Sequence, residues 1–100
     1  MQKDILQKAI KTYGTHNQML KCIEECGELS RAVSRILIEL SSGDGFTTEE
    51  SEENLHEEIA DVSIMLKQLL IMFDCEDEVS AWEFKKTNRL EERLNNEKLS

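Results

Sequence analysis

Proline is absent from all 100 residues of this chain, and no other feature of the sequence constrains the fold as strongly. A proline inside a helix removes a backbone hydrogen bond and clashes with the preceding turn, so a chain without proline can form long helices. The one cluster of turn-forming residues is SSGDG at residues 41–45. The sequence therefore predicts an all-α fold in which this cluster separates long helices.

Start and stop signals divide the chain into the four helices of a bundle, within a single domain at residues 1–100. Gly14 supplies a break between the first two helices, and Thr47 with Glu50 three residues later forms a capping box before the third. A polar stretch at residues 74–77 precedes the fourth helix. The predicted helices cover residues 2–12, 16–40, 48–73 and 79–96.

The chain has 21 acidic and 12 basic residues, which gives a formal net charge of -9. This charge repels the phosphates of nucleic acids and anionic lipids, so we expect neither a nucleic-acid polymer nor a membrane as a partner. The longest apolar run, residues 69–73, is too short to span a bilayer, and the N-terminal MQKDILQKAI has no apolar signal core. The three cysteines form no CxxC pair, which suits a reducing compartment. We therefore expect a cytoplasmic protein.

Four carboxylates interrupt the apolar faces of the two central predicted helices. At about 100° per residue, Glu25 falls inside an apolar stripe with Glu28 at its edge. Glu58 and Asp61 repeat this arrangement on the following helix. The stripe around Glu25 consists of Cys22, Leu29, Ala32, Val33, Ile36 and Leu40. The stripe around Glu58 consists of Leu55, Ile59, Val62, Met65, Leu66 and Leu69.

Burial of several carboxylates together costs free energy through desolvation and mutual repulsion, so a positive charge must lie among them. Ligand sets made only of oxygen select hard cations, and Mg²⁺ retains waters and accepts substrate phosphates as further ligands. The alternative is that these carboxylates are solvated surface residues of an acidic protein. The same spacing at the same angular position on two helices favours a magnesium site. Its predicted ligands are Glu25, Glu28, Glu58 and Asp61, and Mn²⁺ is a substitute for Mg²⁺.

The residues around these carboxylates resemble a known family. Residues 24–28 read EECGE, an EExxE motif, and residues 58–61 read EIAD, an ExxD motif. With their surrounding strings, KCIEECGELSRAVSR and LHEEIADVSIMLKQL, they resemble the two central helices of the MazG-like all-α nucleoside triphosphate pyrophosphohydrolases. The similarity extends over about residues 15–95. The connection between the motifs is longer than usual for the family and contains the SSGDG stretch.

This resemblance implies hydrolysis of a nucleoside triphosphate, usually a deoxynucleotide, between its α and β phosphates, with release of a monophosphate and pyrophosphate. It also implies dependence on Mg²⁺ and assembly into a homodimer or homotetramer. The metal ligands of the family correspond to Glu25, Glu28, Glu58 and Asp61. Glu24 corresponds to a glutamate that either binds a further metal or orients the attacking water.

Basic residues on the last predicted helix are the candidates for binding the leaving pyrophosphate. Lys86, Arg89 and Arg93 are spaced i, i+3 and i+7, which places them on one face. The string FKKTNRLEERL also resembles the closing helix of the family. Basic residues late in a helix are favoured by the helix dipole without any ligand, so both explanations stay open.

Two further functions are compatible with the sequence. A non-catalytic helical interaction module would pair the inward carboxylates with Lys or Arg of a partner chain and would bind no divalent metal. A metal-dependent phosphohydrolase acting on another phosphate ester would release orthophosphate instead of pyrophosphate. In each case a second apolar face on the central helices predicts a subunit interface. The residues of that face are Met19, Ile23, Leu37, Ile64 and Ile71.

Overall fold

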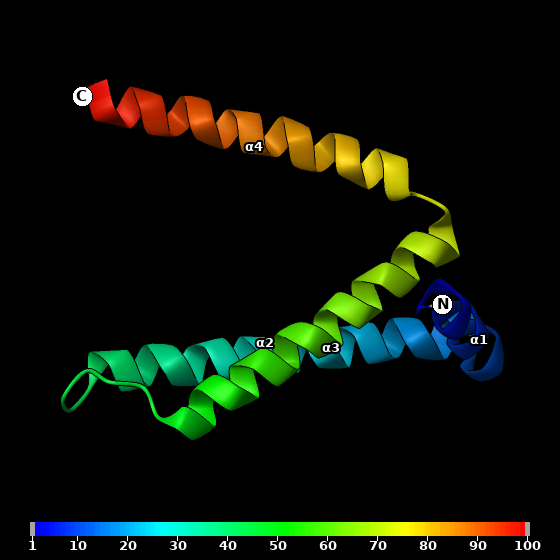
Figure 1. The fold of residues 1–100 in the computed structure, drawn as a ribbon, viewed down its shortest axis with the longest axis horizontal. Helices are drawn as coiled ribbons and strands as arrows, with labels where there is room; N and C mark the ends of the chain where they lie inside the picture. Colours follow the sequence, from blue (N-terminus) through cyan, green and yellow to red (C-terminus); the bar gives the residue numbers. More distant parts are fainter. Residues whose placement is uncertain (1, 100) are drawn as a thin grey trace.

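The computed structural model describes residues 2–99, and these residues form four α-helices without a strand (Figure 1). The helices are α1 (Gln2–Tyr13), α2 (Thr15–Ser41), α3 (Glu49–Phe73) and α4 (Glu76–Leu99). The all-α prediction is confirmed, and the predicted bounds of the first three helices are right to within one residue. Helix α4 is three residues longer than predicted at each end. Within residues 2–99, no helix combines the length and the apolar character that crossing a membrane requires.

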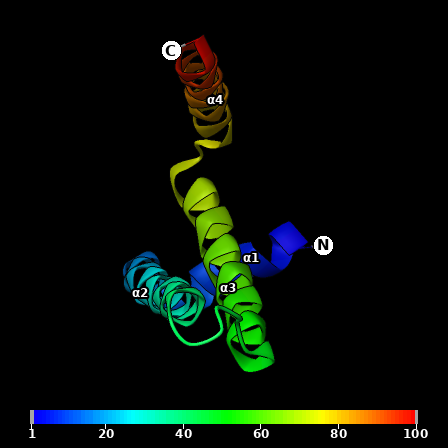
Figure 2. The same cartoon turned by 90° about the vertical axis from the view of Figure 1, so that its left-hand side faces the viewer.

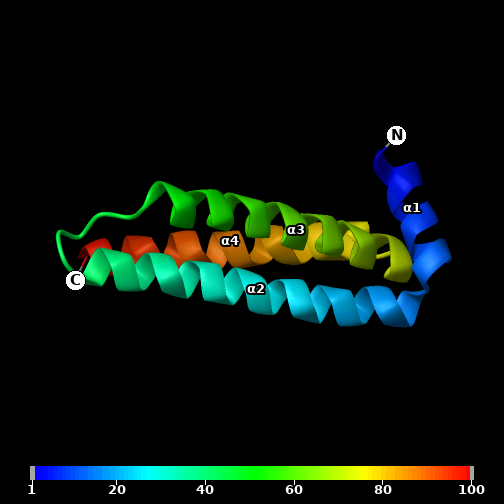
Figure 3. The same ribbon diagram turned by 90° about the horizontal axis from the view of Figure 1, so that it is seen from below.

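Helices α2 and α3 form the packed centre of the molecule. They run antiparallel, joined by the loop at residues 42–48, and their mutual contact is more extensive than that of any other helix pair (Figure 3). Ala32 of α2 and Met65 of α3 are buried. A buried pair of amides also joins the helices, because Gln18 Nε2 donates to Gln68 Oε1 at 2.8 Å. Helix α1 lies across one end of this pair and contacts both helices.

The loop between α2 and α3 is held by hydrogen bonds to Glu39. The Glu39 carboxylate accepts from the Thr48 N–H at 3.0 Å and from the Ser51 hydroxyl at 2.5 Å. Thr48 caps α3, because its side-chain oxygen accepts from the Ser51 N–H at 3.1 Å. The predicted capping box of Thr47 and Glu50 is therefore wrong by one residue. Thr47 has the capping-box partner Glu50 and Thr48 does not, but either threonine can cap a helix, and Thr48 is the one that bonds Glu39.

Helix α4 leaves the rest of the molecule at a hydrogen-bonded corner. Asp74 follows the last turn of α3 in the left-handed conformation, with φ 48° and ψ 51°. The Cys75 N–H donates to the Leu70 carbonyl at 3.1 Å, and the Val79 N–H donates to the Cys75 carbonyl at 3.0 Å. The two-residue connection is thus bonded to both helices. Within the described chain, α4 diverges from α3 and makes no extensive contact with α1, α2 or α3 (Figures 1 and 2).

The chain is extended for its size. Its radius of gyration is 17.6 Å, whereas a compact domain of this length has about 13 Å. Some residues of the predicted apolar stripes are half exposed: Val33 (50%), Leu40 (52%), Ile59 (51%) and Leu66 (50%). They have no cover because α4, which a closed four-helix bundle would supply as a further layer, does not pack on the α2–α3 pair.

Candidate metal centre

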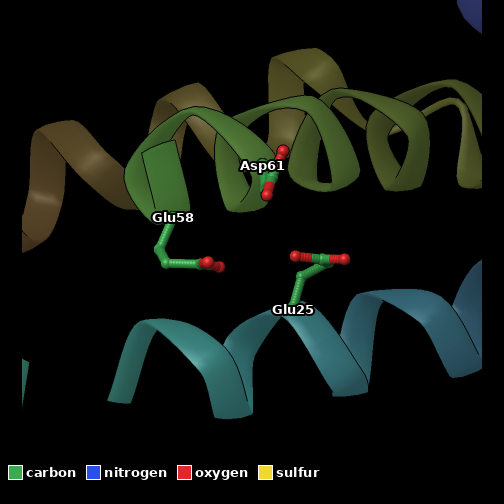
Figure 4. Close-up of side chains that lie close together, drawn as sticks. All are labelled: Glu25, Glu58 and Asp61. Carbon is green, nitrogen blue, oxygen red and sulfur yellow. The ribbon is translucent and has the colours of Figure 1, made fainter. Parts of the chain in front are cut away.

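Three carboxylates from two helices point toward one another in the centre of the α2–α3 pair (Figure 4). Glu25 projects from α2, and Glu58 and Asp61 project from α3. One carboxylate oxygen of each residue lies within 4.8 Å of the others, and all three residues are partly buried. The spacing of three residues puts Glu58 and Asp61 one helical turn apart, and the packing of α3 against α2 brings Glu25 opposite both. These three residues are the acidic cluster.

Glu58 is the least compensated member of the acidic cluster. Its Oε2 atom is buried and has no hydrogen-bond partner among the described residues. Burial raises the pKa of the Glu58 carboxyl above its ordinary value, and the neighbouring carboxylates Asp61, Glu25, Glu28 and Glu57 raise it further, in that order. A buried acceptor beside other negative charges is destabilised unless a cation or a proton compensates it.

The basic residue paired with the acidic cluster lies at its margin. Lys21 Nζ is 3.3 Å from Glu25 Oε1, but the Lys21 side chain is 52% exposed. An exposed ion pair of this kind contributes little, because water and salt screen it. Lys21 therefore holds Glu25 without compensating the buried oxygen of Glu58. The sequence did hold a signal for this contact, because Lys21 and Glu25 are spaced i, i+4 on one helix.

Glu28, the fourth predicted ligand, lies near the acidic cluster without joining it. Its Oε1 atom accepts from Arg31 Nη2 at 2.8 Å, and this pair is exposed on the surface of α2. Glu28 is nevertheless close enough to raise the pKa of Glu58. The structure thus brings three of the four predicted ligands together and places Glu28 beside them, where a surface arginine holds it.

Glu24 lies outside the acidic cluster, as its position on the helix predicts. It is exposed and lines a surface pocket at the α1–α2 corner together with Tyr13, Asn17 and Lys21. Glu57 is rotated about 100° outward from Glu58 and was therefore not among the predicted ligands, but its charge raises the pKa of Glu58. Its position directly before Glu58 in the string HEEIAD was the available signal.

The predicted phosphate-binding residues are not near the acidic cluster of their own chain. Lys86, Arg89 and Arg93 lie on α4, where every described side chain is exposed, and α4 makes no extensive contact with α2 or α3. Lys86 Nζ instead lies 5.9 Å from the centre of the Trp82 ring on the same helix. A sequence pattern places these cations on one helix face, but it does not say where that helix lies.

The donor set of the acidic cluster fits a hard divalent cation. It offers carboxylate oxygens only, which suits Mg²⁺ or Mn²⁺ and does not suit metals that prefer nitrogen or sulfur. The buried oxygen of Glu58, which has no hydrogen-bond partner among the described residues, is the observation that favours such an ion. Comparison of the chain with protein-family models, with curated proteins and with solved structures finds no match. The geometry and the motifs described above therefore carry the functional argument.

Proposed function

We propose that this protein is a Mg²⁺-dependent nucleoside triphosphate pyrophosphohydrolase, which cleaves between the α and β phosphates and releases a nucleoside monophosphate and pyrophosphate. The buried, unpartnered oxygen of Glu58 facing Glu25 and Asp61 carries this proposal. The resemblance of EECGE at residues 24–28 and EIAD at residues 58–61 to the MazG-like family supports the choice of reaction. The MazG-like identity of the bundle is part of the same proposal.

The proposal assigns a role to each of these acidic residues. Glu25, Glu58 and Asp61 hold the cation, and Glu28, which lies beside them, completes the ligand set. A divalent cation bound there neutralises charge on the phosphates and lowers the pKa of a bound water. Glu24, which lies outside the acidic cluster, binds a further metal or orients the attacking water. The reaction needs no covalent nucleophile, and Cys26, on the exposed surface of α2, takes no part.

The proposed enzyme is a homo-oligomer that acts in the cytoplasm. Its three cysteines are free, which agrees with a reducing compartment. Its apolar side chains remain exposed on α2, α3 and α4, which agrees with burial between copies. Four of the five predicted interface residues, Met19, Ile23, Leu37 and Ile64, are among those exposed side chains, whereas Ile71 is half-buried.

The experiment that tests the reaction is a measurement of pyrophosphate release from a panel of canonical and modified nucleoside triphosphates with Mg²⁺. We expect wild-type protein to release pyrophosphate and Glu58→Gln to lose at least about 100-fold in rate, because a ligand charge is removed without a change of shape. Glu53→Gln is the matched control, since Glu53 is exposed on the same helix. Release of orthophosphate would instead identify a phosphohydrolase of another class.

The exposed apolar faces favour a second candidate, a non-catalytic helical interaction module. In that case basic residues of a partner would pair with the acidic cluster. The module predicts no hydrolysis of any triphosphate and no thermal stabilisation by millimolar Mg²⁺. The enzyme proposal predicts both hydrolysis of a triphosphate and thermal stabilisation by millimolar Mg²⁺.

A further inference from the structure

A cavity lies where the first two turns of α1 meet the end of α3 and the corner that leads into α4 (Figure 1). Its volume is about 370 Å³, which is within the range of sites that bind small molecules in proteins. The floor is apolar, because Leu6 of α1 and Leu70 and Ile71 of α3 line the cavity and are half-buried. We call this site the corner cavity.

The corner cavity is separate from the acidic cluster, because no member of that cluster lines it. Lys67 and Asp74 do line it, and they follow Asp61 on α3 and at its end. At about 1.5 Å per residue, they lie about 9 and about 20 Å further along the helix than Asp61. A ligand of the corner cavity is therefore independent of the reaction proposed for the acidic cluster.

Charged side chains of both signs surround the apolar floor of the corner cavity. Two are cations, Lys3 and Lys67, and two are anions, Asp74 and Glu76. The side chain of none of them forms an ion pair or a hydrogen bond with another described residue. In a chain with a net charge of -9, they form a locally neutral set whose charges are available to a ligand.

The apolar floor separates the opposite charges along α3. Lys67, Leu70, Ile71 and Asp74 are spaced i, i+3, i+4 and i+7, so they share one face of the helix. Lys67 and Asp74 are two turns apart, which is about 10 Å along the helix, and the two apolar residues lie between them. Glu76 adds a second negative charge beside Asp74 in the corner. The corner cavity is thus positive at Lys67, apolar in the middle and negative at the corner.

A short apolar peptide with free ends matches this lining. An extended chain spans about 3.3–3.6 Å per residue, so three residues cover the roughly 10 Å between the charged ends. The amides of Gln2 and Gln7 also line the cavity, make no side-chain hydrogen bond to another described residue, and can bond the peptide groups. A free amino acid is too short to reach both ends. An apolar anion would use Lys67 and leave Asp74 and Glu76 without a partner.

We propose that the corner cavity binds an apolar peptide of about three residues, with its carboxylate at Lys67 and its ammonium at Asp74 and Glu76. The bound peptide contacts α1, α3 and the corner together. Helix α1 has no buried residue of its own and packs less extensively on α3 than α2 does. Occupancy of the cavity therefore stabilises α1 and holds the direction in which α4 leaves α3.

Titration with the tripeptide Ala-Leu-Ala, followed by NMR of the backbone amides, tests this site without any use of catalytic activity. We expect saturable shifts that are largest around Leu6, Leu70 and Ile71, with a dissociation constant of about 1 mM or tighter. Acetylating the N-terminus of the peptide, or amidating its C-terminus, should each weaken binding about 3- to 5-fold, because charge pairs at an open rim are partly screened. No saturable shift at about 10 mM peptide would overturn the proposal. Equal affinity for free leucine, or for the peptide blocked at both ends, would overturn it as well.

Variants match each end of the peptide to its residues in the cavity. Lys67→Ala should weaken binding of the free peptide about 3- to 5-fold and leave the affinity for the C-terminally amidated peptide unchanged. Asp74→Asn combined with Glu76→Gln should act in the same way on the free peptide and leave the N-acetylated peptide unchanged. Asparagine also adopts the left-handed conformation, so the corner is preserved. Lys8→Ala, on α1 outside the cavity, is the control and should change no affinity. Equal weakening of the free and the blocked peptide by either variant would refute the proposed orientation.

Discussion

Helix α4 and the α2–α3 pair both carry apolar residues at helical spacing, but α4 is the more polar sequence and the two lie in different structural situations. The pair buries residues such as Ala32 and Met65 and is joined by the Gln18–Gln68 hydrogen bond. Helix α4 has 24 residues, and every described side chain on it is exposed. Most of the stability of a helix in a protein comes from packing of its apolar face. The comparison teaches that packing within the chain stabilises the pair, whereas packing against the other described helices contributes little to α4.

The largest expected difference between the two regions is in the free energy of unfolding, when a side chain in the core of the α2–α3 pair is truncated. Met65→Ala removes a side chain that is 4% exposed and leaves a cavity, so we expect a loss of about 2–5 kcal/mol in the free energy of unfolding. Leu90→Ala on α4 is the control and should leave that free energy unchanged at protein concentrations low enough to dissociate the proposed oligomer. Urea unfolding followed by circular dichroism measures both. Equal losses would mean that α4 packs on its own chain.

A second change should act on α4 without affecting the pair. Trp82→Ala removes an aromatic side chain from the face of α4 that also carries Lys86. We expect the dissociation constant of the proposed oligomer to rise about 30-fold, as for an interface hot spot. Phe84→Ala is the matched control, because Phe84 is 72% exposed on another face of α4. Concentration-dependent light scattering or analytical ultracentrifugation measures the constant. The same shift for both variants would remove the distinction between the faces.

The smallest effect concerns the loop that joins the pair. Hydrogen bonds from Ser51 and Thr48 hold the pKa of Glu39 below its ordinary value of 4.5. The folded state therefore binds fewer protons than the unfolded state in this range, and the stability from Glu39 is lost as pH falls below about 4.5. Glu39→Gln should lower the melting temperature by about 5 °C at pH 7 and by less at pH 3. Thermal melts at both pH values check this, and a shift of equal size at both would contradict it.

The sequence predicted the helices well because absent prolines, the SSGDG cluster and apolar periodicity all act locally. It also predicted the convergence of Glu25, Glu58 and Asp61, because a carboxylate inside an apolar stripe faces whatever that stripe packs against. It did not predict that Glu28 pairs with Arg31, although their i, i+3 spacing on one helix was an available signal.

The sequence could not predict the position of α4, and the reason is different. The apolar spacing from Val79 to Leu94 predicts a helix that must be covered, but it does not say by what. Among the described residues, the corner at Asp74 sets the direction in which α4 leaves α3, and a left-handed aspartate has no strong sequence signal. The exposure of Val33 and Ile59 follows from the same cause.

The central claim is that the acidic cluster binds a divalent cation, and calorimetric titration with Mn²⁺ or Mg²⁺ tests it most directly. We predict saturable binding to the wild-type protein and to Glu53→Gln, together with a rise in melting temperature that corresponds to about 2.7 kcal/mol at 100 times the dissociation constant. Glu58→Gln should bind at least about 10-fold more weakly. Equal binding by Glu58→Gln and wild type, or no saturable binding by either, would contradict the claim.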